Sequence, residues 1–194
     1  MVGGDPQGAR ALIRAERPAD RPGVFRVVRD AFVRDDEARL VDALRATEAF
    51  IPELSLVALD GEAIVGHVLF TRVTIRDENA AHPGLALAPV SVAPSHQGKG
   101  IGSALIHRGL EVARAGGHGV VIVLGRPGYY PRFGFVPAQA RGIRAPFPVN
   151  DRSFMALALR AGGLKGVRGI VEYAAPFAPG AIGETPQLPP SERH

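Results

Sequence analysis

Apolar residues recur at helical spacing in three parts of the chain. The first part begins at Asp20, the expected N-cap, and has Pro22 in its first turn. The second covers residues 35–46 and opens with three acidic residues, which oppose the positive end of a helix dipole. The third covers residues 100–115 and ends at a Gly-Gly pair, a common helix stop. The pattern therefore predicts three helices.

Short runs rich in Val, Ile and Leu predict strands between and after these helices. The predicted strands cover residues 11–16, 54–59, 63–75, 85–92, 119–124, 153–159 and 168–173. Asp60-Gly61 favours a tight hairpin turn, and residues 77–84 are polar and are predicted to form a loop. Residues 128–134 form a short aromatic-rich segment. The order of elements predicts a mixed α/β domain with helices on both faces of one sheet.

The length of 194 residues suits one domain with short extensions. Residues 1–10 are polar and glycine-containing, and residues 178–194 are proline-rich, so we expect two tails around a domain at residues 11–177. With 46% hydrophobic residues the chain can build a real core. No stretch approaches the ~20 apolar residues of a membrane span, and the start lacks the apolar core of a signal peptide. We therefore expect a soluble, cytoplasmic protein.

Residue composition excludes several kinds of site. The chain has no cysteine, so disulfides, thiolate zinc sites, iron–sulfur clusters and a cysteine nucleophile are all ruled out. The six histidines are scattered, and we expect no metal. The net charge of +4 comes from arginines spread along the chain rather than gathered in a stripe, which disfavours nucleic-acid binding.

The segment 90–103, VSVAPSHQGKGIGS, carries the most informative chemistry. A buried strand leads into a loop with three glycines, and a helix follows at once. Glycines let the backbone approach a ligand, and the free N–H groups and dipole of a helix start favour an anion. A P-loop is excluded because Lys99 is followed by Gly100, and no glycine at 104 or 105 completes a dinucleotide fingerprint. Composition alone leaves a pyrophosphate site and a structural turn both open.

The order of residues in two segments resembles the GCN5-related N-acetyltransferases. Gln97-Gly98-Lys99-Gly100-Ile101-Gly102 matches the Q/R-x-x-G-x-G/A pattern with which that family binds the pyrophosphate of acetyl-coenzyme A. Tyr130-Pro131-Arg132-Phe133-Gly134-Phe135 matches its second signature. The runs LGRPGYYPRFGF and GIVEY narrow the resemblance to the YhbS-type group. The resemblance covers residues 11–177 and implies the three-layer α/β/α acyl-CoA N-acyltransferase (GNAT) fold, with a mixed sheet.

The same resemblance implies roles for individual residues. It assigns acetyl-CoA, the cosubstrate, to Val90, Ser91, Val92, Gln97, Gly98, Lys99, Gly100, Ile101, Gly102 and Ser103. A backbone N–H at residues 90–92 would hold the thioester oxygen, and the loop would hold the pyrophosphate. Residues 90–92 also suit an ordinary buried strand, and Lys99 also suits a solvated surface.

Tyr130 is the expected catalytic residue. The family uses the tyrosine at this motif position to protonate the departing coenzyme A thiolate. A tyrosine with a pKa near 10 can protonate a thiolate whose conjugate thiol has a pKa near 8.5. The alternative is an aromatic that packs beside Tyr129 and Phe133.

No general base is predicted, because the strands at 85–92 and 119–124 carry no acid. Glu53, Glu37 and His67 are candidates by residue type, each with a structural alternative, and a water chain is another. Arg126 stands where related sequences often have an acid, which puts the substrate preference in question. We expect the acceptor site to use the first two helices and the loops near 50–53 and 77–84.

Three functions remain open on the sequence. The favoured one is transfer of an acetyl group from the coenzyme A thioester to a primary amine by direct attack in a ternary complex. The second is a non-catalytic module that binds acetyl-CoA or CoA, and the third is a basic nucleic-acid-binding domain. A homodimer is a further expectation, since sheets in this family often pair across chains, and no membrane partner is expected.

Overall fold

The computed structural model describes residues 11–177, so the two predicted tails at 1–10 and 178–194 lie outside the described residues. The helices and longer strands are, in chain order, β1 (Leu12–Ala15), α1 (Arg21–Phe32), α2 (Asp36–Arg45), β2 (Phe50–Asp60), β3 (Ala63–Arg76), β4 (Ala81–Val92), α3 (Ile101–Ala115), β5 (Val120–Leu124), β8 (Phe154–Ala158) and β9 (Gly169–Glu172). These include every helix and strand that the hydrophobic pattern predicts. Two strands of two residues each, β6 (Val136–Pro137) and β7 (Ile143–Arg144), were not predicted.

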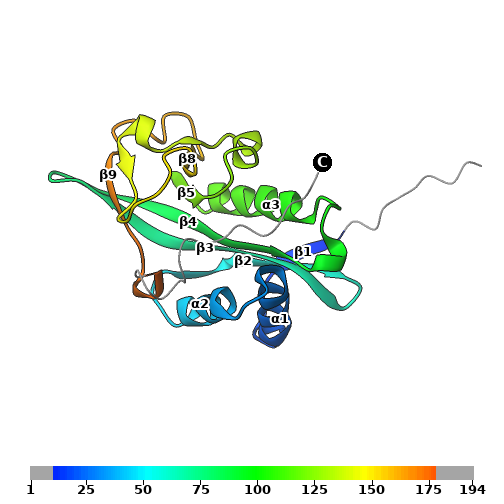
Figure 1. The fold of residues 1–194 in the computed structure, drawn as a ribbon. Coiled ribbons are helices and arrows are strands. Elements are labelled where there is room, and N and C mark those ends of the chain that lie inside the picture. The colour runs from blue at the N-terminus through cyan, green and yellow to red at the C-terminus, as the bar shows by residue number, and fades with distance from the viewer. Residues whose placement is uncertain (1–10, 178–194) are drawn as a thin grey trace, which may run out of the picture.

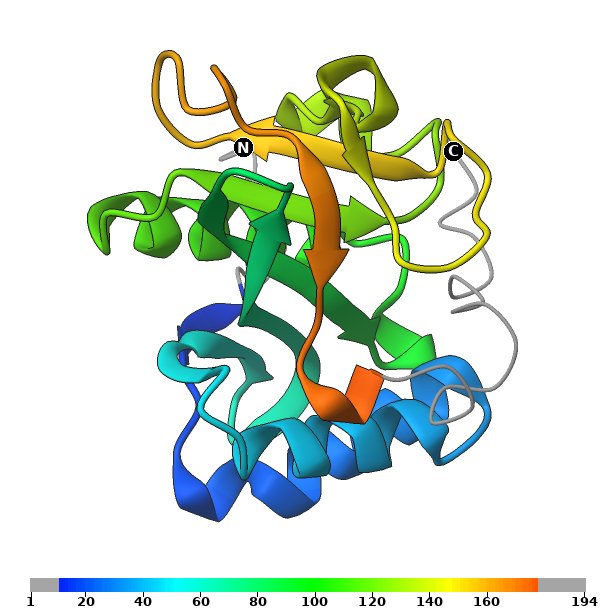
Figure 2. The ribbon, with the colours of Figure 1, turned by 90° about the vertical axis from the view of Figure 1, so that its left-hand side faces the viewer.

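The described strands form one mixed sheet in the order β1-β2-β3-β4-β5-β8-β6. Most neighbours along this order are antiparallel, whereas β4 and β5 run parallel because α3 connects them. Strand β9 pairs with residues 74–76 at the end of β3, beyond the point where β2 begins. Figure 2 shows β9, in orange, descending across the sheet from the β8 side toward α2. The predicted mixed α/β class is confirmed.

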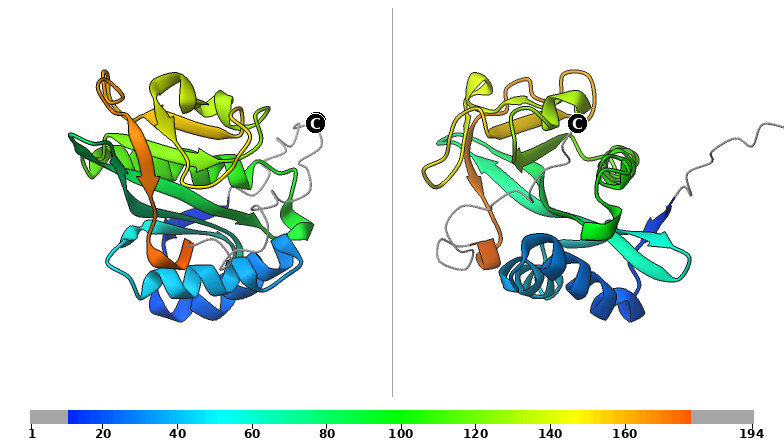
Figure 3. Two further views of the ribbon diagram at one scale, coloured as in Figure 1. Left: turned by 60° about the vertical axis from the view of Figure 1, so that its left-hand side comes forward. Right: turned by 45° about the vertical axis from the view of Figure 1, so that its right-hand side comes forward.

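The helices lie on both faces of the sheet. In Figure 1, α1 and α2 cover one face and α3 covers the other, and the right-hand view of Figure 3 looks nearly along α3 on its own side. On the first face, α1 and α2 bury their apolar stripes against Val57 and Leu69 of the sheet. On the second, Leu105 and Ile106 of α3 are fully buried. The sheet is therefore the middle of three layers.

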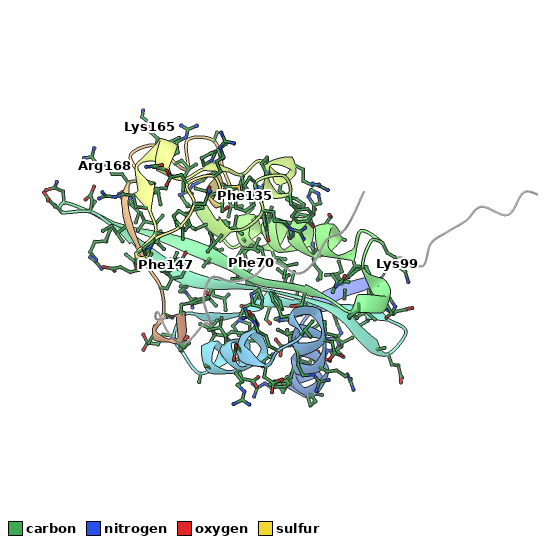
Figure 4. The ribbon with its side chains drawn as sticks, viewed as in Figure 1. Phe70, Lys99, Phe135, Phe147, Lys165 and Arg168 are labelled. Atoms are coloured by element: carbon green, nitrogen blue, oxygen red, sulfur yellow. The ribbon has the colours of Figure 1, made fainter. Side chains whose placement is uncertain are left out.

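Gly109 sets how closely α3 approaches the sheet. A Cβ at this position would lie 2.2 Å from Cε2 of Phe70 on β3, so no larger residue fits without movement. A glycine on the packing face of a helix permits such a close contact, because it has no side chain. Phe70 itself is fully buried near the middle of the molecule (Figure 4).

Two sequence predictions about local structure need correction. Strand β4 already begins at Ala81, paired with Arg76, so the predicted loop at 77–84 shrinks to residues 77–80. The Asp77 carboxylate closes this loop by accepting the N–H groups of Asn79 and Ala80 at 2.8 and 2.7 Å. The sequence also predicts a loop near residues 50–53, but these residues belong to β2.

The predicted N-cap residue Asp20 is confirmed in its position, but its side chain bonds elsewhere. It occupies the N-cap position of α1, as predicted, but its side chain makes no cap hydrogen bond there. The carboxylate instead accepts Nη2 of Arg14 at 3.0 Å and the backbone N–H of Arg17 at 2.6 Å. The side chain thus ties β1 to the turn before the helix.

Candidate active site

Strands β4 and β5 separate toward their C-terminal ends. Their parallel pairing covers only Leu85 with Val121 and Ala86 with Ile122. Strand β4 nevertheless continues to Val92 and β5 continues to Leu124. From residue 87 onward, the edge of β4 that faces β5 has no described strand as a partner.

This open edge presents backbone donors at Val90 and Val92. The N–H of Ala93 donates to the carbonyl of Val65 on β3 at 2.8 Å. In an antiparallel pair, hydrogen-bonded and non-bonded residue pairs alternate. Ser91, opposite His67, is therefore bonded to β3, whereas Val90 and Val92 turn their N–H and C=O groups toward the open edge. The Nε2 of Gln97 donates to the Val92 carbonyl at 3.1 Å, which ties the following loop to this strand end.

The glycine loop ends at an uncapped helix start. Gly98 and Gly100 have φ angles of 74° and 78°, a left-handed conformation that favours glycine. Gly100 is the N-cap of α3 and supplies no side-chain cap. The first intrahelical bond is made by the N–H of Ala104, so the N–H groups of Ile101, Gly102 and Ser103 lack helical partners.

Electrostatics at this helix start favour an anion. The helix dipole places partial positive charge on the free N–H groups. Lys99 is exposed in the same loop, and Figure 4 places it at the end of the molecule where α3 begins. The predicted residues 97–103 thus form a loop and the first residues of α3, and the N–H groups of residues 101–103 are available as donors.

Tyr130 lies in the short helix η3 (Tyr130–Phe133), just after β5. Its ring packs so tightly on Gly125 that a Cβ there would lie 2.0 Å from the ring's Cε2. The rings of Tyr129 and Phe135 contact it edge-on, with centroids at 5.2 and 5.7 Å. Sequence reasoning missed Gly125, whose signal is its position directly after a buried strand.

The hydroxyl of Tyr130 is protonated at neutral pH. Burial raises its pKa above the ordinary value, the neighbouring Tyr129 adds to the rise, and the charge of Arg126 opposes it. Among residues 11–177, no hydrogen bond involves this hydroxyl. It is therefore a proton donor that no described residue engages.

Two contacts join η3 to α3. The hydroxyls of Tyr129 and Ser103 lie 3.1 Å apart, and the rings of Phe133 and His107 meet edge-on at 5.0 Å. The guanidinium of Arg132 lies 4.6 Å from the centroid of the Tyr129 ring. Tyr129 thus links the segment that carries Tyr130 to the first turn of α3.

The three candidate bases lie in very different places. Glu53 is exposed on β2. Glu37 is buried on α2, but Nη2 of Arg34 lies 2.6 Å from its Oε1, so it is held in an ion pair. His67 is fully buried on β3 and lies directly opposite Ser91 of the open strand end. Only His67 of these three is next to the predicted site.

Within residues 11–177, no cluster of three or more His, Asp or Glu side chains is arranged to bind a metal ion. None of the described helices combines the length and apolarity that crossing a membrane requires.

Comparison with known proteins gives consistent matches. The family model described as "Acetyltransferase (GNAT) domain" matches residues 12–138. The uncharacterized N-acetyltransferase YhbS of Escherichia coli K12 is 36% identical over 167 residues, which cover 86% of this chain and 98% of that protein. The uncharacterized N-acetyltransferase YjhQ of the same organism is 41% identical over 134 residues, or 69% of this chain and 74% of that protein.

Two solved structures are also similar. The crystal structure of E. coli YhbS in complex with CoA has a TM-score of 0.84 at 34% identity, covering 94% of this chain and 100% of that one. A GNAT family acetyltransferase from Brucella melitensis in complex with acetyl-CoA has a TM-score of 0.69 at 36% identity, covering 86% of this chain and 97% of that one.

Proposed function

Because this chain belongs to the GNAT family of N-acetyltransferases, we propose that it moves an acetyl group from acetyl-CoA to a primary amine by direct attack in a ternary complex. The observation that carries this proposal is the open edge of β4 beside an uncapped helix start. One element offers donors for a thioester oxygen, and the other offers donors for a pyrophosphate. The similar YhbS and Brucella structures hold CoA and acetyl-CoA.

In this proposal the loop at residues 97–103 binds the pyrophosphate. The free N–H groups of Ile101, Gly102 and Ser103 point along the start of α3, where the helix dipole favours negative charge. Lys99 adds a positive charge from the same loop. Gln97 keeps the loop next to the strand end through its bond to Val92.

The thioester then lies along the open edge of β4. An N–H of Val90 or Val92 donates to the carbonyl oxygen, which gains negative charge as the amine attacks. A fixed donor stabilises that charge in the transition state more than in the ground state. The pantetheine arm runs beside residues 90–92, which are part of a strand and therefore rigid.

Tyr130 completes the site by protonating the departing sulfur. Its raised pKa keeps the hydroxyl protonated, and its ring is fixed by Gly125 and by the aromatic neighbours. A protonated, immobilised hydroxyl beside the end of β5 suits a general acid.

Calorimetric titration of acetyl-CoA into the protein tests the first step. We expect one-to-one binding that a Gly100→Trp variant loses, because the bulky side chain would fill the loop. Gly117→Trp is the matched control, since Gly117 also has a left-handed φ of 81° and open space but lies at the far end of α3. Equal binding by Gly100→Trp and the wild type would overturn the proposed site.

A screen of primary amines tests the transfer. The panel contains a polyamine, an arylalkylamine, an α-amino acid amide and a lysine peptide, with released CoA measured by a thiol reagent. We expect turnover of at least one amine. Binding of acetyl-CoA without any transfer would favour the non-catalytic module instead.

A further inference from the structure

A cluster of charged and polar side chains is buried on the face of the sheet that α1 and α2 cover. Its members, called here the buried relay, are Glu16, Arg45, Ser55, His67 and Ser91. They come from five separate places, namely the end of β1, the end of α2, β2, β3 and β4. Ser55, His67 and Ser91 are 0% exposed, and the side chains of Glu16 and Arg45 are 5% and 6% exposed.

The contacts within the relay fix the proton positions. The Ser55 hydroxyl donates to Oε2 of Glu16, and Nη2 of Arg45 lies 2.7 Å from Oε1 in an ion pair that is too poorly aligned for a hydrogen bond. The Ser55 Oγ also lies 2.9 Å from Nε2 of His67. Because the single proton of Ser55 is used on Glu16, Nε2 of His67 must be the donor in this second bond.

The remaining nitrogen of His67 is therefore a free base. With the proton on Nε2, Nδ1 carries an unshared electron pair, and it is buried without a hydrogen-bond partner among the described residues. The Oγ of Ser91 is likewise buried without a partner in the described part of the chain. Unpartnered buried polar atoms are costly, so Nδ1 of His67 and Oγ of Ser91 each need a partner that the described residues do not supply.

The two unpartnered atoms belong to neighbouring side chains. His67 and Ser91 are directly opposed in the β3–β4 register and so lie on the same face of the sheet. Opposed side chains of this kind have Cβ atoms about 5 Å apart. One water molecule between them can bond to both, since a buried water typically makes two to four hydrogen bonds.

Ser91 also lies between the two donors of the open edge, Val90 and Val92. The loop that starts α3 is on one face of the sheet, and the Ser91 side chain is on the other, toward α1 and α2. If coenzyme A approaches from the α3 side, the acceptor amine has the opposite side, where the Ser91 hydroxyl lies. This inference therefore rests on the proposed function.

We propose that His67, acting through Ser91, takes the proton that the acceptor amine loses during acetyl transfer. Glu16 and Ser55 hold the imidazole in the required tautomer and stabilise the imidazolium that forms. No carboxylate on the two central strands is needed, which accounts for their lack of acidic residues.

The charge states agree with this role. Burial lowers the pKa of His67, and Glu16 only partly opposes this, so the ring is neutral and able to accept a proton. Burial raises the pKa of Glu16, but bonds from His67 and Ser55 and the charge of Arg45 outweigh it, so the carboxyl is ionised. Arg45 also pairs with Asp42, and no ion pair or hydrogen bond joins His67 to a described residue of α1.

Acetyl transfer to the amine forms one bond, breaks one bond and moves two protons. The amine nitrogen bonds to the thioester carbon, the carbon–sulfur bond breaks, and its electron pair leaves with the sulfur. The nitrogen gives one proton to Ser91, whose own proton passes through the bridging water to Nδ1 of His67. Tyr130 gives one proton to the sulfur. After product release, the proton leaves His67 by the reverse path through the bridging water and Ser91, and Tyr130 regains a proton.

Nuclear magnetic resonance of the full chain with ¹⁵N-labelled histidine tests the tautomer without any acceptor. The His67 signals are assigned by their loss in His67→Gln, and acetyl-CoA is then added. We expect a neutral ring with its proton on Nε2. A neutral His67 ring with its proton on Nδ1 instead would overturn the proposal.

Kinetics with the amines of the panel test the function of the relay. Ser91→Ala keeps the backbone donors but removes the hydroxyl, and we expect kcat to fall by about 10²-fold with unchanged acetyl-CoA affinity. Thr71→Val is the matched control. Thr71 lies on β3 and also has a buried hydroxyl without a partner among the described residues, but it is distant from Ser91 in the β3–β4 register. This variant should keep the wild-type kcat.

His67→Gln retains a donor toward Ser55 but has no titrating nitrogen. We expect the same loss of kcat. We also expect the kcat of the wild type to fall at acidic pH as His67 becomes protonated, and this acidic limb to be absent from the pH profile of His67→Gln. A purely structural role for His67 would lower stability without removing this limb. If His67→Gln does not fold, Ser91→Ala decides alone.

The outcomes separate the two proposals. If the wild type transfers acetyl groups but Ser91→Ala turns over as fast as Thr71→Val, the relay is overturned and the acetyltransferase stands. If the wild type acetylates no amine of the panel, the proposed function falls and the relay falls with it.

Discussion

Individual residues of the site are fixed by their packing more than by hydrogen bonds. Tyr130 is the clearest case, since its ring fills the space left by the missing side chain of Gly125. Its role as acid was suggested by a motif in the sequence. The contact that orients it joins two residues five positions apart around an irregular turn, and periodicity does not predict such a contact.

Replacement of Tyr130 by Phe tests its role as acid. The ring and its contacts remain, but the proton donor is lost, so we expect kcat to fall by roughly 10²–10⁴-fold with unchanged acetyl-CoA binding. Steady-state kinetics and calorimetry measure the two quantities. Tyr129→Phe is the control, since it removes the neighbouring hydroxyl, which bonds to Ser103, but keeps the Tyr130 hydroxyl. Equal turnover by Tyr130→Phe and wild type would remove Tyr130 from the mechanism.

His67 gives the stability a predictable pH dependence. Burial lowers its pKa in the folded state below the ordinary 6.5, so the unfolded chain binds a proton more readily. The neutral His67 therefore contributes to the unfolding free energy fully above pH 6.5. This contribution is lost as the pH falls toward the lowered pKa of His67 in the folded protein. We expect the unfolding free energy to decline below pH 6.5 in denaturant titrations, and to decline less in His67→Gln. Parallel curves for the two proteins would contradict this assignment.

At the scale of elements, the apolar periodicity predicted the helices and longer strands because each buries one continuous face. It failed at residues 81–84 and 50–53, where polar or proline-containing segments nevertheless form the ends of strands. Strands β6 and β7 are too short to carry any pattern. The glycine loop was predictable because its residues are contiguous, whereas the buried relay comes from five separate segments.

The connection between α1 and α2 contains a strained residue that the sequence does not reveal. Val33 has a φ of 60° and is 85% exposed. A β-branched residue in this left-handed region costs about 1–2 kcal/mol.

We therefore expect Val33→Gly to raise the unfolding free energy by about 1 kcal/mol, measured by chemical denaturation. Val33→Ala is the control, because it removes the exposed apolar atoms but keeps the Cβ that causes the strain. The expectation would be wrong if both variants changed stability equally.

On the scale of the whole molecule, the sheet separates two tasks. The α3 face carries the loop proposed for coenzyme A, and the α1–α2 face carries the buried relay. Strand β4 belongs to both, because its open edge adjoins the loop and its Ser91 side chain adjoins His67. The position of α3 on the sheet therefore affects the site directly, and Gly109 controls that position.

Gly109→Ala is expected to damage both stability and binding. The added methyl group would lie 2.2 Å from the ring of Phe70, so α3 must shift away from the sheet. Overpacking of this kind costs about 1–3 kcal/mol, and movement of the helix start also weakens acetyl-CoA binding. Adding Phe70→Leu to this variant makes room for the methyl group and should recover part of both losses. Denaturation and calorimetry on the single and double variants measure this, and a Gly109→Ala protein as stable as wild type would show that α3 is free to adjust.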